Sequence, residues 1–151
     1  MDTQCNQEAL QFHPLFRRAV WGQFDGGTIT TDAGGLRRRE AEKRTGIIAQ
    51  FAASFRDHRD PARIEHGVKE LVAQRVYGLA LGYEDLNDHD ELRRDPLLAV
   101  LVEKPDPRGE TRARARDQGQ ALAGKSTLNR LELSEAEVGS ADRLWRSAAF
   151  S

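Results

Sequence analysis

The stretch Leu79–Leu98, LALGYEDLNDHDELRRDPLL, decides the fold because it joins the end of an apolar helix to two further helix starts. The apolar run ends at Gly82. Asp85 is placed to cap one following helix, and Asp95 is placed to cap another that has Pro96 at its first position. The stretch therefore predicts three helices that are joined by short turns.

A cluster of carboxylates surrounds His89 in this stretch and raises the question of a metal or catalytic site. A calcium loop that opens at Asp85 would need glycine where Asp90 stands and glutamate where Pro96 stands. Acidic residues near helix starts are also favoured by the helix dipole. We interpret the cluster as helix caps and assign no metal ligand, with a metal site as the alternative. Its members are Glu84, Asp85, Asp88, Asp90 and Glu91.

The N-terminal part of the chain combines a polar segment with β-prone runs. Residues 1–18 are polar with scattered apolar side chains, and we expect a flexible arm there. The run AVWGQF at 19–24 and the residues Thr28–Thr30 favour strands, and Asp25–Gly27 between them favour a turn. A small β-hairpin over residues 19–30 is therefore predicted.

Hydrophobic periodicity predicts two helices after this hairpin. Asp32 is placed to cap the first, whose run LRRREAEKR at 36–44 has its arginines balanced by glutamates on a solvated face. Contact of the triple arginine Arg37–Arg39 with phosphate is the alternative. The second helix follows Gly46 and presents an apolar side to the core. Its core residues are Ile47, Ile48, Phe51, Ala52 and Phe55.

The longest predicted helix starts near Pro61 and forms the spine of the core. Gly78 inside this helix costs about 1 kcal/mol relative to alanine, so it indicates the close approach of another element. His58 and His66 have no metal-ligand spacing, and we place both on the surface. The apolar stripe consists of Ile64, Val68, Leu71, Val72, Val76, Leu79 and Ala80.

Composition places the chain among globular proteins without pointing to a partner. With 23 basic and 24 acidic residues, the net charge is −1, so only local patches argue for nucleic acid. The single cysteine, Cys5, cannot form an internal disulfide, and the sequence has no long apolar run. We expect a cytoplasmic protein that does not bind a membrane.

The strongest basic patch lies in RGETRARAR at residues 108–116, within a predicted linker over 105–124. Immediately after it, Gly119–Ser126 match the P-loop pattern GxxxxGK[ST]. A working P-loop follows a buried strand, and the preceding ARARDQ is not one. We instead expect Ser126 to cap a helix that carries Leu128 and Leu131, in the manner of a recognition helix that enters a DNA groove. The expected DNA contacts are Arg112, Arg114, Arg116, Lys125, Ser126, Thr127, Asn129 and Arg130.

Four ordered blocks resemble the N-terminal region of bacterial insertion-sequence transposases of the DDE type, group 1. They cover roughly residues 20 to 133, and they are Phe24–Gly35, Asp57–Arg63, Gln74–Asp90 and Gly124–Glu132. The resemblance implies a larger α/β protein with an RNase H-like core, which binds the ends of its mobile element. It also implies Mg²⁺ or Mn²⁺ for the full-length family member and allows self-association. In the family the catalytic acids lie downstream of these blocks, so we assign no catalytic residue here and expect the chain to end before the catalytic core.

Taken together, the sequence predicts a mainly α-helical fold that is entered through a small β-hairpin. The expected parts are an arm at 1–18, a hairpin and helical domain at 19–104, the linker at 105–124, and short helices at 125–151. The capping pattern at Ser134–Glu137 belongs to the last part. The predicted function is DNA binding within a transposase. The alternatives are a nucleotide-binding protein that uses Gly119–Ser126 and a helical interaction module without nucleic acid.

Overall fold

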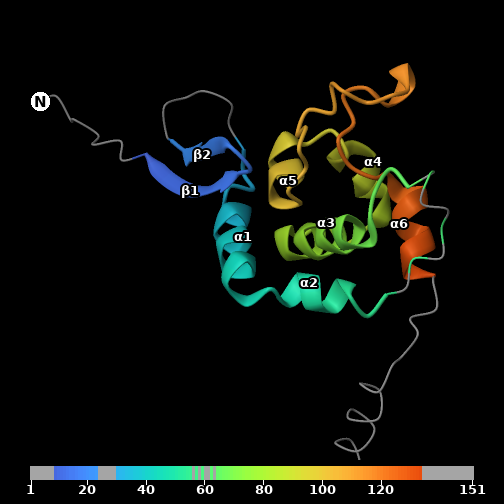
Figure 1. Ribbon diagram of the computed structural model, residues 1–151, viewed down its shortest axis with the longest axis horizontal. Helices are drawn as coiled ribbons and strands as arrows, with labels where there is room; N and C mark the ends of the chain where they lie inside the picture. The colour runs from blue at the N-terminus through green and yellow to red at the C-terminus, as the bar shows by residue number, and fades with distance from the viewer. Residues whose placement is uncertain are drawn as a thin grey trace, which may run out of the picture.

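The computed structural model describes residues 9–23, 30–55, 57, 59, 62 and 64–133, which form a mainly α-helical fold (Figure 1). A two-stranded hairpin lies beside a group of helices that surrounds α3. The predicted fold class, mainly α with a small β-hairpin, is confirmed. In chain order the elements are β1 Leu10–Leu15, β2 Arg18–Gly22, α1 Gly34–Thr45, α2 Ile47–Ala52, α3 Val68–Leu81, η2 Leu86–Asp88, α4 His89–Leu92, α5 Pro96–Leu101, η3 Ala115–Asp117 and α6 Lys125–Glu132.

The hairpin lies earlier in the chain than the sequence predicts. β1 pairs antiparallel with β2, from Leu10 opposite Gly22 to Leu15 opposite Arg18, and β1 occupies residues that we expected to form a flexible arm. Phe16, in the turn, has a positive φ of 54°. The reason for the shift is packing, because Leu15 is buried and Phe12 packs against the helical core. The predicted turn at 25–27 lies outside the described residues.

α1 docks the hairpin onto the helices through one buried arginine. The side chain of Arg39 is 1% exposed, and it donates to the carbonyl oxygens of His13 at 2.7 Å and Pro14 at 3.0 Å. It also contacts Glu103 at 3.3 Å. The expectation of a solvated arginine face is therefore wrong for Arg39, because the hairpin turn supplies carbonyl acceptors that local sequence does not reveal. Arg37 and Arg38 are exposed, as expected.

Asp32 does not cap α1, which corrects a second expectation. The N-cap residue is Ala33, and no side chain accepts a hydrogen bond there. The Asp32 carboxylate instead accepts from the hydroxyl of Tyr83 at 2.8 Å, so it links the start of α1 to the turn after α3.

α2 begins after Gly46, whose φ of 64° ends α1 in the left-handed conformation. Glu42 caps α2, because its carboxylate accepts from the backbone N–H groups of Ile48 and Ala49. Ile48 is buried, but Ile47 is 65% exposed and Phe51 is 53% exposed. The prediction that both of these residues belong to the core is wrong, since this short helix is apolar on two sides and only one side contacts α3.

α3 is the spine of the core, as predicted, although it begins at Val68 rather than near Pro61. Its start is fixed by the Glu70 carboxylate, which accepts from Gly67 N–H at 3.1 Å. Leu79 is exposed rather than part of the buried stripe. His66 is buried and not on the surface as expected, whereas His58 lies outside the described residues.

The helix starts in the deciding stretch are capped as predicted. Asp85 accepts from Asn87 N–H at 2.8 Å, and Asp95 accepts from Leu97 N–H at 2.7 Å at the start of α5. The close approach predicted at Gly78 is confirmed, because a Cβ atom there would lie 2.9 Å from Cε1 of His89.

The segment predicted as a linker packs onto the helical domain. Ala121, Leu122 and Ala123 are buried, and Leu122 N–H donates to the carbonyl oxygen of Arg93 at 3.1 Å.

Among the described residues, no helix has the length and apolar character needed to cross a bilayer.

Candidate nucleic-acid interface

α6 presents a polar face to solvent because its apolar side is held in the core. Leu128 is 0% exposed and packs with Leu71 of α3, and Leu131 is partly buried against the same group. The exposed residues Ser126, Asn129 and Arg130 follow the three- and four-residue spacing of one helix face. Thr127 is half-buried. Of the α6 residues predicted to contact DNA, the structure brings these three together on one open surface.

The first turn of α6 is capped by a residue from another element. Asp90 accepts from the backbone N–H of Lys125 at 3.1 Å, and its second carboxylate oxygen lies 3.4 Å from Lys125 Nζ. The backbone hydrogen bond from Lys125 holds the pKa of the Asp90 carboxyl below its usual range. Gly124 is the N-cap residue and Ser126 lies inside the helix, so the expectation that Ser126 caps it is wrong.

The same geometry explains the P-loop match. In a P-loop, the backbone N–H groups at the helix start face a phosphate. Here the carboxylate of Asp90 occupies that position, and a Cβ atom on Gly124 would lie 3.0 Å from its Oδ1. Residues 115–117, just before the motif, form the 3-10 helix η3 rather than a buried strand. The geometry therefore does not support nucleotide binding at Gly119–Ser126.

A buried glutamine fixes the approach to α6. Gln74 of α3 donates to the Ala123 carbonyl oxygen at 2.8 Å and accepts from Ala123 N–H at 3.0 Å. The same amide lies 3.1 Å from Nδ1 of His89. At the other end of α6, Arg75 contacts Glu132 at 2.6 Å. Sequence reasoning missed Gln74, although a glutamine on the inner side of an apolar helix was an available signal.

The arginines before α6 are carried on a closed loop rather than a free linker. Gly119 N–H donates to the Gly109 carbonyl oxygen at 3.0 Å and closes the loop. Asp106 accepts from Thr111 N–H at 2.7 Å, which lowers the pKa of its carboxyl. Arg112 is half-buried and contacts Glu65 at 3.2 Å.

Two other loop arginines, Arg114 and Arg116, are exposed. Arg116 lies 3.8 Å from Asp117, and the side chain of Arg114 has no hydrogen bond or ion pair within the described part of the chain. These two guanidinium groups are therefore the loop's most available contacts for an anion.

Comparison with known protein families finds one matching family, described as transposase DDE domain group 1, over residues 12–147. The chain belongs to this family. Its function is therefore that of a transposase, and the family acts on DNA. No curated protein and no solved structure matches the chain.

DDE transposases use divalent metal, so the acidic stretch at 84–91 is the place to test for ligands. Three of its five carboxylates have separate partners: Asp85 accepts from Asn87, Asp90 accepts from Lys125, and Glu91 contacts Arg94 at 3.4 Å. His89 points into the core and is 0% exposed. No group of three His, Cys, Asp or Glu side chains that could hold a metal ion occurs among the described residues. The residues of this stretch do not fit a metal centre.

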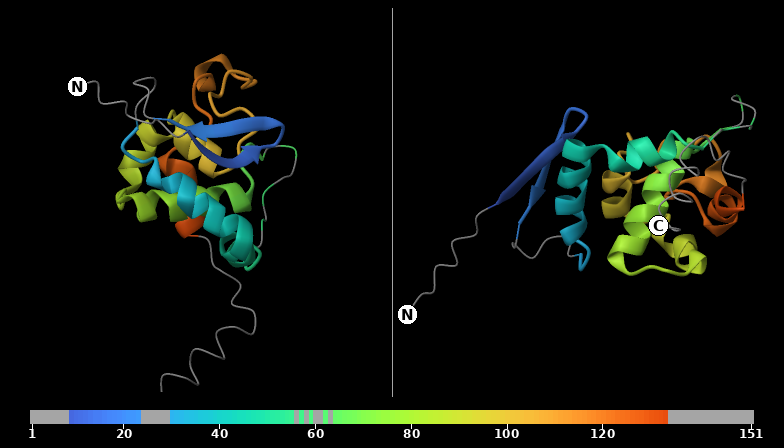
Figure 2. Two further views of the ribbon diagram at one scale, coloured as in Figure 1. Left: turned by 90° about the vertical axis from the view of Figure 1, so that its left-hand side faces the viewer. Right: turned by 90° about the horizontal axis from the view of Figure 1, so that it is seen from below.

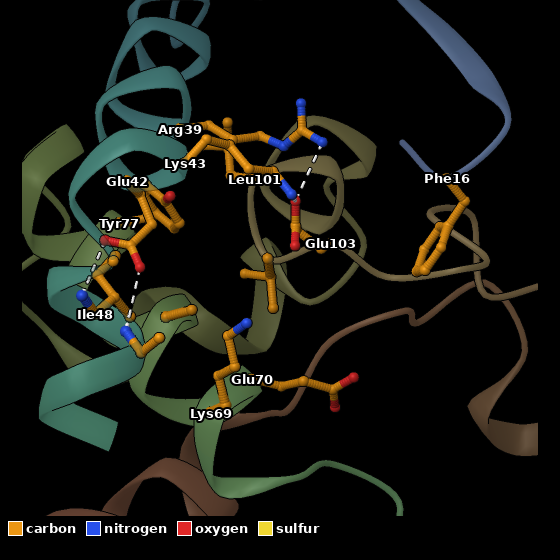
Figure 3. A pocket seen from close by; sticks show the side chains of 14 residues that line it. Phe16, Arg39, Glu42, Lys43, Ile48, Lys69, Glu70, Tyr77, Leu101 and Glu103 are labelled. Carbon is orange, nitrogen blue, oxygen red and sulfur yellow. Dashed lines mark hydrogen bonds and ion pairs between the residues drawn. The ribbon is translucent and has the colours of Figure 1, made fainter. Parts of the chain in front are cut away.

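A separate pocket of about 380 Å³ lies between the hairpin turn and the helices α1, α2, α3 and α5 (Figure 3). Ile48, Tyr77 and Leu101 give it an apolar lining, and burial raises the pKa of Tyr77 to about 12. Its charged side chains are mostly paired within the chain, as in the contact of Lys43 with Glu103. None of the predicted DNA contacts lines this pocket.

Proposed function

We propose that this chain supplies DNA binding to the transposase, with α6 as the helix that reads base edges. The observation that carries the proposal is the exposed face of α6 on a helix whose other side is buried. Asn129 and Arg130 are of the types that pair with adenine and guanine edges in the major groove. A rigidly held helix can present these side chains in a fixed register, because Gln74 and Asp90 hold the residues at its start.

The closed loop before α6 supplies the phosphate contacts in this proposal. Arg114 and Arg116 are exposed, and their long side chains can reach the phosphate backbone beside a groove. Arg112 and Lys125 already have carboxylate partners in Glu65 and Asp90, so each would exchange one partner for another on binding. Their contribution to affinity is therefore smaller than that of Arg114 and Arg116.

We further propose that the transposase cleaves DNA at the ends of an insertion sequence and then transfers the cleaved strands to a new site. Asp85 caps η2 and Asp90 holds the start of α6, so we assign these two carboxylates a structural role rather than one in phosphoryl transfer. In this proposal the described residues of the chain serve to hold the transposase on DNA.

A salt titration with the full chain tests the phosphate contacts. Binding to a duplex with the terminal sequence of the element and to a scrambled duplex is followed by fluorescence anisotropy. The Arg114→Ala/Arg116→Ala variant is expected to bind both duplexes more weakly, and its salt slope is expected to flatten by about 0.9 for each lost phosphate contact. Arg94→Ala is the control for the loss of an arginine elsewhere on the surface, because Arg94 is exposed but already paired with Glu91. Parent-like affinity and slope in the double variant would show that this loop does not contact DNA.

A further inference from the structure

The N-terminal third of the described chain is more basic than the whole. Residues 9–55 contain seven Lys or Arg and four Asp or Glu, which gives 7 − 4 = +3, whereas the complete chain has a net charge of −1. From the sequence we expected the glutamates of α1 to offset its arginines, with phosphate contact as the alternative. The structure shows how those acidic groups are used.

The described acidic side chains of this region are engaged inside the fold. Glu40 accepts from His13 N–H at 2.7 Å and contacts the His13 ring. Glu42 caps α2 through Ile48 and Ala49. Asp32 accepts from Tyr83, as described above. Each of these carboxylates keeps its negative charge, but none forms an ion pair with an exposed arginine of this region among the described residues.

We name these exposed residues the α1 arginine surface, and they are Arg17, Arg18, Arg37, Arg38 and Arg44. Within the part of the chain that the structure describes, none of their side chains has an ion pair or hydrogen bond. Arg37 and Arg44 lie seven residues apart on α1, about 10 Å along the helix axis, and both border a groove of about 530 Å³ between β1 and α1. The hairpin turn lies near the C-terminal end of α1, because Phe16 lines a pocket with Lys43. The five guanidinium groups thus share one end of the molecule.

This end is far from α6. Figure 1 and the right-hand view in Figure 2 both place the hairpin and α1 toward one end of the long axis and α6 toward the other. A duplex on α6 would leave the α1 arginine surface open. The two basic regions are therefore separate binding surfaces rather than parts of one patch.

We propose that the α1 arginine surface is a second DNA contact, which binds phosphates independently of sequence. Five exposed arginines that have no ion-pair partner among the described residues match a polymer that repeats one negative charge. The inference shares its DNA partner with the proposed function but does not require that α6 reads bases. One chain would then contact two segments of DNA.

The test compares the full-length parent with Arg37→Ala/Arg44→Ala on a random duplex at 50 to 200 mM salt. Two lost phosphate contacts are expected to flatten the salt slope by about 1.8, so the loss of affinity across this range becomes about 12-fold smaller. Arg37→Lys/Arg44→Lys is the matched control and should keep the parent slope, since lysine also binds phosphate. Circular dichroism checks that both variants are folded.

The outcomes separate this inference from the proposed function. If Arg37→Ala/Arg44→Ala binds random duplex with the affinity and slope of the parent, the α1 arginine surface is not a DNA contact. If that variant loses affinity while Asn129→Ala binds cognate duplex as the parent does, this inference holds and the α6 proposal fails. If Asn129→Ala loses its preference for cognate over random duplex while Arg37→Ala/Arg44→Ala binds as the parent does, the α6 proposal holds and this inference fails.

Discussion

Gly78 and His89 show how tightly single residues are constrained in this core. The imidazole of His89 is fully buried, and its Nε2 atom has no hydrogen-bond partner among the described residues. A methyl group at position 78 would meet Cε1 at 2.9 Å and Nε2 at 3.1 Å. The ring cannot retreat into solvent, so the space at Gly78 is required.

Gly78→Ala is therefore expected to destabilise the fold although alanine favours helix. Overpacking typically costs about 1–3 kcal/mol, which exceeds the gain of about 1 kcal/mol in helix propensity. Gly34→Ala is the control, because a Cβ atom at Gly34 in the first turn of α1 meets nothing within 4 Å. Urea unfolding of the parent and both variants measures the change in the free energy of unfolding. Equal or higher stability of Gly78→Ala would contradict the contact with His89.

His66 makes stability depend on pH in a defined direction. Burial, and then the positive charges of Lys104 and Arg112, lower the pKa of His66 from 6.5 to about 3. Glu70 lies 4.0 Å from the ring and favours the protonated form, but its carboxylate is held by Lys104 at 2.7 Å, so burial dominates.

The unfolded chain therefore takes up a proton at His66 below pH 6.5, while the folded chain does so only near pH 3. As the pH is lowered from 6.5 toward 3, the free energy of unfolding should decrease by at most about 1.4 kcal/mol per pH unit. His66→Gln is expected to lose less stability than the parent between pH 7 and pH 5 in urea titrations. His89, whose pKa is also lowered by burial, retains part of the dependence. An unchanged slope in His66→Gln would contradict the buried neutral state.

At the scale of elements, the sequence predicts what local signals determine. The helix starts at Asp85 and Asp95 and the spine formed by α3 depend on caps and periodicity, and both are confirmed. The hairpin was misplaced because strand pairing and the docking of Arg39 are contacts between distant residues. The cap of α6 by Asp90 joins residues 35 positions apart, so no local pattern reveals it.

The placement of α6 depends on Gln74. Gln74→Leu leaves the buried N–H and C=O of Ala123 without their partner, which is expected to cost about 1–3 kcal/mol for each unpaired group. Gln118→Leu, at an exposed position, is the control and should stay close to the parent. Thermal and urea unfolding measure the difference. Matching stabilities for the two variants would show that the amide does not hold the entry to α6.

At the scale of the molecule, the helices around α3 separate two surfaces that carry exposed arginines. α6 and its loop form one end, and the hairpin with α1 forms the other (Figure 2). Family membership places the chain in a transposase, whereas our proposal that α6 reads DNA rests on the burial and capping of that helix. The polar residues of α6 could be predicted from the sequence because they form one contiguous helix. The α1 arginine surface could not, because it combines α1 with the turn of a hairpin whose place in the chain depends on contacts between distant residues.

The central claim is that α6 reads base edges, and its most direct test is the ratio of affinities for element-end and random duplex in variants of α6. Asn129→Ala and Arg130→Ala are each measured on the element-end duplex and on a random duplex at one salt concentration. We expect each change to cost about 1–3 kcal/mol on the element end and much less on the random duplex, because base contacts exist only at the cognate site. Equal losses on both duplexes, or no loss on either, would contradict the reading of DNA by α6.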